Sequence, residues 1–239
     1  MFITIDEYNP ANIRYRFFTK KVNTGHRYFH HHEGYAENKA KIAQHFGSED
    51  ISIVDQKHTN NIVFPKKYGE YLVADGQITN KPNIALAVIT ADCVPILLSD
   101  EKKNIIASVH AGWRGARSNI INEALEKMRS LGANNITALI GPCIRQRSYE
   151  VDNSFYKDFI EESITYKKFF IPSAREKYYM FDLPGYVKQK LEKARAGQIF
   201  DVEKNTYEDE ENFFSFRRYT HNPESPMGNI VAIIMLLKE

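Results

Sequence analysis

The sequence predicts a mixed α/β (α+β) fold, built around one sheet system and contained in a single domain of all 239 residues. Three apolar runs at 84–90, 94–100 and 104–110 follow one another closely, which indicates buried strands. A glycine-containing turn after the third run leads into an amphipathic stretch at 116–131 and then another apolar run at 135–141. Strands and a helix in this order are typical of α/β and α+β domains.

The other elements follow from the same patterns along the chain. A helix is predicted over about residues 36–46, and the stretch 51–64 is rich in β-forming residues. The stretch 116–131 is predicted to be one helix. Its apolar face and the glycine that ends it are Ile120, Ile121, Ala124, Leu125, Met128 and Gly132. Near the end of the chain, 187–197 is predicted as a helix and 230–237 as a buried strand.

The charge balance and the cysteine content narrow the class of protein. The chain has 32 Lys and Arg residues against 30 Asp and Glu, and a nucleic-acid partner would need a more concentrated basic surface. Hydrophobic residues make up 43% of the chain, as in globular rather than disordered proteins. With only two cysteines, Cys93 and Cys143, a disulfide scaffold is excluded and a reducing compartment is favoured.

No targeting or membrane-spanning segment is predicted. The first ten residues lack a basic region followed by an apolar stretch, so we expect no signal peptide. The most apolar runs, 84–90 and 230–237, are far shorter than the roughly 20 residues needed to cross a bilayer. We therefore expect a cytoplasmic protein without a membrane partner.

Three side chains that can bind a metal lie at or near the ends of predicted β segments: His58, Cys93 and His110. They would make a three-ligand zinc site with an open fourth position, which can lower the pKa of a bound water to about 7. Their spacing matches no short zinc motif, and taken alone they fit a small buried cysteine and a hydrogen-bonded core histidine better. The triple histidine at 30–32 is predicted to lie in a solvated loop, because adjacent residues of a strand face opposite ways.

Other positions are candidates for binding or catalysis, each with a plainer alternative. Arg114 precedes a predicted helix, where a guanidinium and N–H groups can hold a phosphate, or it forms a surface ion pair. Asp75, in an Asp-Gly pair, is a partner of the metal ligands, a general base or part of a turn. Arg217 and Arg218 bind an anion or form an exposed basic pair. Cys143 is predicted to pack in the core.

Seven segments of the chain carry an unusual combination of motifs. They are KHTNNIV (57–63), ADGQIT (74–79), TADCVPILL (90–98), VHAGWRG (109–115), IGPCIRQRSYEV (140–151), FDLP (181–184) and TYEDEENFFSFRR (206–218). In this order they resemble the purine nucleoside phosphorylase family formerly called multicopper polyphenol oxidase or laccase-domain proteins, which includes the bacterial peptidoglycan-editing factor. TADC and HAGWRG are the most specific of these strings.

The resemblance implies that His58, Cys93 and His110 are zinc ligands. It implies a compact domain with mixed β-sheets flanked by helices, similar to a toxin-deamidase-like cysteine-hydrolase fold. Members of the family cleave adenosine, inosine, guanosine or methylthioadenosine with phosphate, giving the base and ribose 1-phosphate, and they deaminate adenosine. The implied cofactor is therefore zinc, and the implied partners are a purine nucleoside and phosphate.

Within that activity, roles can be assigned to four further residues as hypotheses. Arg114 would contact phosphate and Arg217 would bind substrate. Asp75 and Asp92 would handle protons or orient the metal ligands.

The chain departs from the family pattern at three places. Its amino-terminal region matches the family's motif poorly. Asn205-Thr206 stands where many relatives have Cys-Thr, and Gly228-Asn229 stands where Gly-Arg is usual. If the missing arginine helps to bind phosphate or substrate, activity here is weaker or altered.

Two other functions stay open at this point, as does the choice between monomer and homodimer. Cys93 and His110 could be the nucleophile and base of a hydrolase that edits peptidoglycan precursors. The chain could also be a nucleoside-binding module without turnover. Copper oxidase chemistry is disfavoured, because a blue-copper centre takes two histidines and a trinuclear cluster about eight more. The chain has eight histidines in all.

Overall fold

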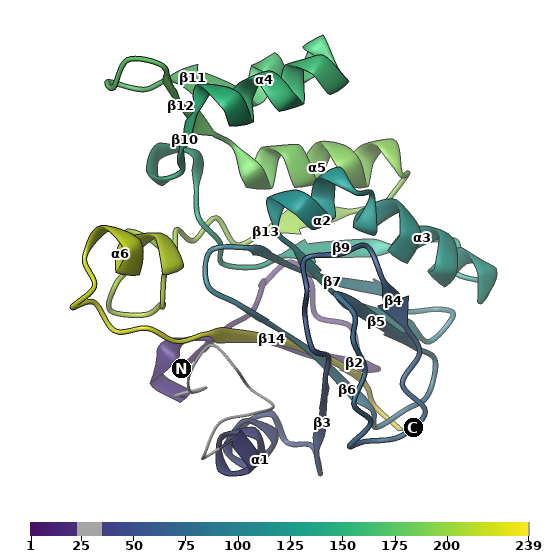
Figure 1. The fold of residues 1–239 in the computed structure, drawn as a ribbon. Helices are drawn as coiled ribbons and strands as arrows, with labels where there is room; N and C mark the ends of the chain where they lie inside the picture. The colour runs from purple at the N-terminus through teal and green to yellow at the C-terminus, as the bar shows by residue number, and fades with distance from the viewer. Residues whose placement is uncertain (23–34, 239) are drawn as a thin grey trace.

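Two large β-sheets packed face to face form the centre of the molecule (Figure 1). The computed structural model describes residues 1–22 and 35–238. In spatial order, the five-stranded sheet consists of β1 (Phe2–Ile3), β2 (Ile13–Phe18), β14 (Ile230–Leu236), β6 (Ala85–Thr90) and β3 (Ile51–Ile53). The six-stranded sheet consists of β13 (Ile199–Asp201), β9 (Thr137–Ile140), β7 (Val94–Asp100), β8 (Ile105–Ala111), β5 (Gly76–Thr79) and β4 (Ile62–Val63). Both sheets are mixed, with β3–β6, β4–β5 and β9–β13 parallel and the other pairs antiparallel.

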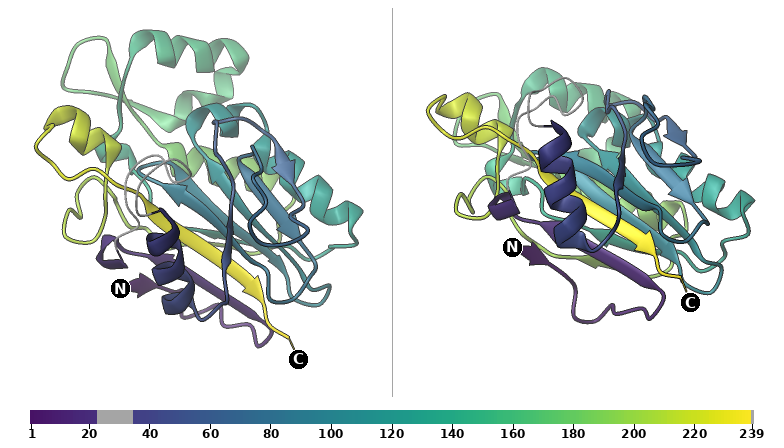
Figure 2. Two further views of the ribbon diagram at one scale, coloured as in Figure 1. Left: turned by 60° about the horizontal axis from the view of Figure 1, so that its bottom comes forward. Right: turned by 90° about the horizontal axis from the view of Figure 1, so that it is seen from below.

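Helices cover the outer faces of this sandwich. On the five-stranded sheet, α1 (Tyr35–Phe46) packs beside β14, as the two views of Figure 2 show. On the six-stranded sheet lie α2 (Trp113–Arg117), α3 (Ile120–Ser130) and α5 (Leu183–Lys193). A smaller unit combines α4 (Asn153–Glu162) with a sheet of β10 (Glu150–Asp152), β12 (Tyr178–Phe181) and β11 (Phe170–Pro172). The last helix, α6 (Phe216–His221), stands apart from the helical layer (Figure 1).

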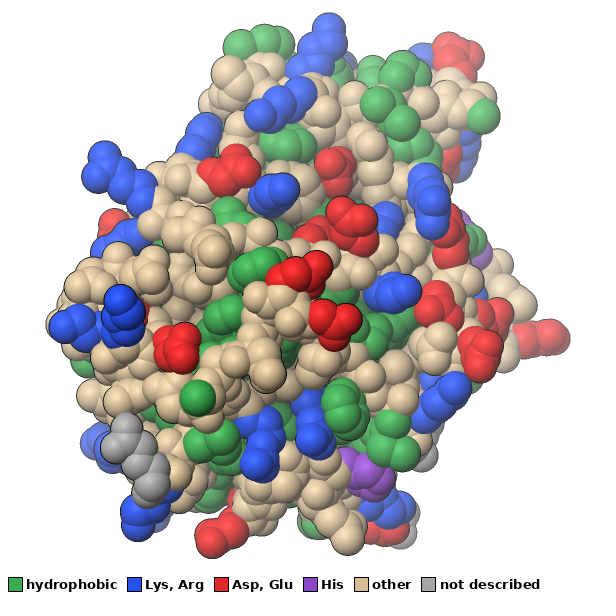
Figure 3. Space-filling view, turned by 180° about the vertical axis from the view of Figure 1, so that it is seen from behind, with side chains coloured by type: hydrophobic (Ala, Val, Ile, Leu, Met, Phe, Trp, Pro, Cys, Tyr) green, Lys and Arg blue, Asp and Glu red, His purple; other side chains and the backbone are tan. Residues whose placement is uncertain are grey.

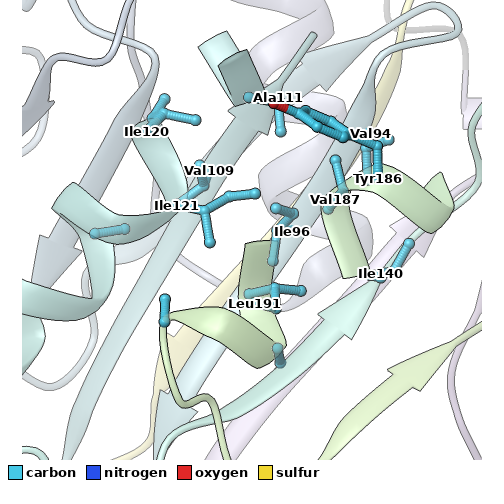
Figure 4. Close-up of a cluster of buried hydrophobic side chains, with 14 of the residues drawn as sticks. Val94, Ile96, Val109, Ala111, Ile120, Ile121, Ile140, Tyr186, Val187 and Leu191 are labelled. Atoms are coloured by element: carbon cyan, nitrogen blue, oxygen red, sulfur yellow. The ribbon is translucent and has the colours of Figure 1, made fainter. Parts of the chain in front are cut away.

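The central strands are mostly apolar because both of their faces are buried. In β7, Val94, Ile96 and Leu98 pack under the helices, whereas Leu97 between them joins the core between the two sheets. Figure 4 shows the helical side of this arrangement, where Ile96 lies among side chains of α3 and α5 such as Ile121 and Leu191. Strands of this kind show continuous apolar runs rather than polar–apolar alternation, which is the pattern that marked them in the sequence.

The predicted strands at 84–90, 94–100, 104–110 and 135–141 are confirmed as β6, β7, β8 and β9, and the terminal strand as β14. The predicted helix at 36–46 is confirmed as α1. The segment at 51–64 holds only the short strands β3 and β4, with a loop between them that carries His58.

The prediction of a single helix at 116–131 is wrong. The chain forms α2 and α3 with a break at Asn119, whose backbone is left-handed at φ 66°. The predicted apolar face is present on α3, and Gly132 follows its end at φ 102°, as expected of a glycine that ends a helix. The helix predicted at 187–197 is α5, which begins and ends earlier than predicted. It begins at Leu183 because Asp182 caps its first turn by accepting from the Gly185 N–H.

Surface charge and helix lengths agree with the composition. On the face shown in Figure 3, side chains of both signs are interspersed. Among the described residues, no helix is both long enough and apolar enough to cross a membrane.

Both cysteines are free, and Cys143 is fully buried in the core under the helices, the packing role predicted for it. The triple histidine at 30–32 lies outside the described residues.

Candidate functional site

The three predicted metal ligands come together at one end of the central strands of the six-stranded sheet. Cys93 comes just before β7 and His110 near the end of β8, and antiparallel pairing sets Val94 opposite Ala111. His58 lies in the loop before β4, with its Nε2 3.9 Å from the Cys93 Sγ. The ligand atoms of all three residues lie within 4.8 Å of one another. Within residues 1–22 and 35–238, no other group of three or more His, Cys, Asp or Glu side chains is arranged to hold a metal ion.

Asp75 holds two of these ligands in place. It is fully buried at the start of β5, and its Oδ1 accepts a hydrogen bond from the His110 Nδ1 at 2.8 Å. The same carboxylate accepts from the backbone N–H groups of residues 57, 58 and 59 and from the Thr59 hydroxyl. These bonds fix the loop of His58, whose backbone has the unusual φ of 60°. Asp75 therefore orients the His110 ring and positions His58 from one side chain.

The electrostatics of the cluster favour its charged forms. Burial raises the pKa of Asp75, but the His110 and Thr59 donors outweigh it and bring the pKa down to about 2. Burial also raises the pKa of the Cys93 thiol, yet the charge of His110 and hydrogen bonds with both histidines lower it to about 6. Burial lowers the pKa of His110, whereas Cys93 and Asp75 raise it to about 9. At neutral pH the metal-free site thus presents a thiolate beside the protonated His110 ring, an ion pair that suits nucleophilic chemistry, and a metal bound there would displace the His110 proton.

The donor set fits zinc, the metal that the sequence predicts. At the usual zinc distances of about 2.3 Å to sulfur and about 2.0–2.1 Å to nitrogen, a tetrahedral sulfur–nitrogen pair is about 3.6 Å apart. The Cys93 Sγ and His58 Nε2 are 3.9 Å apart. The Nδ1 of His110 is hydrogen-bonded to Asp75, so its Nε2 is the nitrogen left for a metal. Histidines that bind zinc in proteins are usually held by a carboxylate in this way.

A cavity of about 720 Å³ opens beside the cluster, with all three candidate ligands in its wall. This volume is in the range of small-molecule sites. Aromatic side chains contribute to the lining, among them Trp113 and Tyr149. Burial raises the pKa of Tyr149 above its usual value. Tyr149 could not be singled out from the sequence, although it lies in the segment IGPCIRQRSYEV, because an aromatic residue there fits a core position equally well.

Two of the three arginines predicted as candidates for anion binding, Arg114 and Arg217, line this cavity. Arg114 is exposed, and its guanidinium lies over the Trp113 ring at 4.5 Å. The Arg217 guanidinium lies over the Tyr149 ring at 5.0 Å and donates to the Glu150 carbonyl at 2.6 Å. Both guanidiniums are thus held on aromatic surfaces.

Arg218 does not line the cavity and is not part of an exposed basic pair. Its side chain is buried and donates to the backbone carbonyls of residues 206, 207 and 213. It serves to hold the segment before α6 in shape.

Asp92 lies in the same wall but contacts different groups from Asp75. Its carboxylate accepts from the Thr206 hydroxyl, the Ser215 hydroxyl and the Arg217 backbone N–H. Burial raises the pKa of Asp92, and these three donors oppose the shift. The residue thereby ties the turn that carries Cys93 to the segment 205–218.

The positions that depart from the family pattern have defined places in the structure. Thr206 is the donor to Asp92, and Asn205 donates to the Ser148 hydroxyl at 2.9 Å. Gly228 and Asn229 lie in the cavity wall. Asn229, which stands where the family resemblance implies an arginine, is therefore part of the lining of the candidate site itself.

Comparison with known proteins relates the chain to named sequences. A family model described as "Multi-copper polyphenol oxidoreductase laccase" matches residues 14–237. A protein of Rickettsia conorii named purine nucleoside phosphorylase is 40% identical over 236 residues, which cover 95% of this chain and 97% of that protein.

Solved structures share the fold. A structure titled hypothetical protein YfiH, from Bacillus licheniformis, superposes with a TM-score of 0.82 at 26% identity, covering 94% of this chain and 92% of that one. A Neisseria meningitidis protein of the DUF152 family superposes with a TM-score of 0.86 at 23% identity, covering 99% of both chains. These likenesses confirm the predicted α+β fold with mixed sheets and flanking helices.

Proposed function

This chain belongs to the family described as multi-copper polyphenol oxidoreductase laccase, and from that premise we propose that it is a zinc-dependent purine nucleoside phosphorylase that also deaminates adenosine. The family resemblance predicted from the motifs is thereby confirmed. The observation that carries the proposal is the cluster of one thiol and two imidazoles in the wall of a cavity that two arginines also line. The name of the Rickettsia relative supports the same activity.

In this proposal, His58, Cys93 and His110 hold zinc, with Asp75 orienting His110. When bound there, zinc supplies a Lewis acid and an activated water. Within the described residues, the arrangement does not provide the histidines that a multicopper oxidase needs. Outside the cluster, the described parts of the chain hold only two more histidines, His45 on α1 and His221 on α6, and neither joins it.

The cavity residues supply binding and orientation for phosphorolysis. A phosphate oxygen attacks C1′ of the ribose, the C1′–N9 bond breaks, and its electron pair leaves with the purine, which takes up a proton. Arg114 and Arg217 would hold the phosphate, since guanidiniums bind its oxygens in pairs. The rings of Trp113 and Tyr149 offer surfaces on which a purine can stack. In deamination, water replaces the amino group of adenosine, giving inosine and ammonia. We place these reactions in the cytoplasm, where the two free cysteines stay reduced.

Chromatography of purified protein incubated with adenosine tests this proposal. We expect adenine to form only when phosphate is present and inosine to form in either condition, and neither to form with the Cys93→Ala variant. A zinc-loaded protein that yields neither product would contradict the proposal.

Gly112 offers a finer test of the zinc site. A Cβ added there would lie 3.0 Å from both the Cys93 Sγ and the His58 Cδ2, while the backbone (φ −69°, ψ 168°) suits alanine. We expect Gly112→Ala to weaken zinc binding by about 10-fold, as changes beside metal ligands do. The free energy of unfolding of the metal-free protein should change by less than about 1 kcal/mol. Competition with a chromophoric chelator measures the first and urea denaturation the second; an unchanged zinc affinity would speak against this ligand geometry.

One observation favours a second candidate function, a cysteine hydrolase. Cys93 lies beside His110, and His110 is hydrogen-bonded to Asp75. In thiol enzymes a nucleophile, a base and an orienting carboxylate are arranged in this way. Peptidoglycan precursors are the substrates to try. Activity that persists in metal-free protein and is lost on alkylation of Cys93 would favour this function, whereas loss of activity on chelation favours the zinc enzyme.

A further inference from the structure

The turn before β7 carries two functional side chains next to each other. Cys93 contacts His58, and Asp92 beside it contacts the segment 205–218 from the far end of the chain. The backbone of Asp92 has φ 87°, in the left-handed region that residues other than glycine rarely adopt. Such a conformation persists only where the surroundings hold it.

The surroundings of Asp92 are three hydrogen-bond donors from one segment. Its Oδ1 accepts from the Thr206 Oγ1 at 2.7 Å, and its Oδ2 accepts from the Ser215 Oγ at 3.0 Å and the Arg217 N–H at 2.6 Å. Thr206 and Ser215 are buried, as is Asp92. Hydrogen bonds to a carboxylate in such surroundings are among the strong ones, so they determine where this segment lies.

Arg217 receives its position from these contacts. Asp92 fixes its backbone, the Glu150 carbonyl accepts from its Nη1 at 2.6 Å, and its guanidinium lies over the Tyr149 ring. The guanidinium of Arg218, the next residue in the chain, instead donates hydrogen bonds to three backbone carbonyls. Of the two neighbours, Arg217 is thus the one presented to the cavity.

We propose that Asp92 is a positioning residue, which holds Arg217 at a fixed place relative to Cys93 so that the guanidinium can bind inorganic phosphate. One carboxylate then couples the two halves of the site, the metal-binding cluster and the phosphate-binding arginine. This inference rests on the proposed function for its substrate, and it assigns to Asp92 a role other than proton transfer or orientation of the metal ligands.

A double-mutant cycle tests the coupling. In Asp92→Asn the amide group replaces one accepting oxygen, so at least one of the three donors loses its partner. We expect Asp92→Asn and Arg217→Ala each to weaken phosphate binding by about 10-fold or more, the usual effect of losing a hydrogen bond to a charged group. The double variant should bind phosphate no more weakly than Arg217→Ala alone, because Asp92 acts through Arg217.

The measurements separate phosphate binding from turnover and from folding. Calorimetric titration with inorganic phosphate gives Kd directly, and steady-state kinetics give KM for phosphate and for adenosine. In Asp92→Asn, KM for phosphate should rise while KM for adenosine and the zinc content stay at their original values. Thr206→Val, which removes one donor and keeps the side-chain shape, should show the same pattern more weakly if Asp92→Asn fails to fold.

Asp100 provides a matched control at the opposite end of β7. It is also a buried carboxylate with three donors, the backbone N–H groups of residues 103, 134 and 135. Asp100→Asn should destabilise the protein and leave phosphate binding unchanged. Multiplicative losses in the double variant, or equal effects of Asp92→Asn and Asp100→Asn on phosphate binding, would overturn the inference. Protein that binds phosphate through Arg217 but forms no product would instead count against the proposed function alone.

Discussion

Replacing Cys93 by alanine is expected to lower the zinc content below one ion per chain and to abolish turnover, with the fold retained. The side chain lies at the cavity wall and is half-buried, so its loss removes a ligand without opening a large hole in the core. Loss of a partner that merely orients a ligand costs about 10–100-fold in affinity or activity, so loss of the ligand itself should cost more. Elemental analysis, circular dichroism and product chromatography measure the three effects.

Cys143→Ala is the matched control for this variant. Cys143 is fully buried among apolar side chains, and burial raises the pKa of its thiol, so it remains a neutral packing residue. We expect this variant to lose some stability and to keep both zinc and activity. A Cys93→Ala protein with one zinc per chain and normal activity would refute the ligand assignment.

Asp75→Asn should have the largest effect on stability, because one buried carboxylate accepts five hydrogen bonds. Asparagine keeps the shape but turns one acceptor into a donor, which then faces the N–H groups of residues 57–59 or the ring of His110. Breaking a buried charged network in this way costs about 3 kcal/mol in the free energy of unfolding. Zinc affinity should fall by about 10–100-fold as well.

Urea denaturation of the metal-free protein and zinc titration measure these two losses separately. The joint loss distinguishes Asp75 from a residue that only stabilises the fold. If Asp75→Asn loses stability but binds zinc as the original protein does, then Asp75 supports the sheet edge and does not orient His110.

The sequence predicted the central strands well and the geometry between them poorly. β7 and β8 are buried on both faces, so most of their residues are apolar. The resulting apolar runs are what predicted these strands. The strand order depends on contacts between distant segments, such as β14 beside β6 and β2, which no local pattern encodes. The break at Asn119 escaped prediction because the apolar spacing of α3 continues the spacing expected of one longer helix.

For the candidate site as well, the identity of the residues could be predicted from the sequence and their contacts could not. The side chains His58, Cys93 and His110 could be named from their positions at segment ends and from the motifs, and the structure brings them together. The different partners of Asp75 and Asp92 could not be read from sequence, because one accepts from residues 16 to 18 positions earlier and the other from residues 114 to 125 positions later. Arg217 and Arg218 look equivalent as a pair, and only the backbone of α6 separates their roles.

The attachment of the three candidate ligands to the backbone has a consequence for the order of folding. Cys93 and His110 flank one hairpin of antiparallel strands, so they meet as soon as β7 pairs with β8. His58 joins them only when Asp75 has captured the loop before β4, a step that needs β5 docked on β8. Pairing between distant segments carries the larger loop-closure entropy, so we expect Cys93 and His110 to come together first and His58 to join them afterwards. If zinc binds there, we expect it to protect the amides of residues 57–59 from hydrogen exchange more than those of β7.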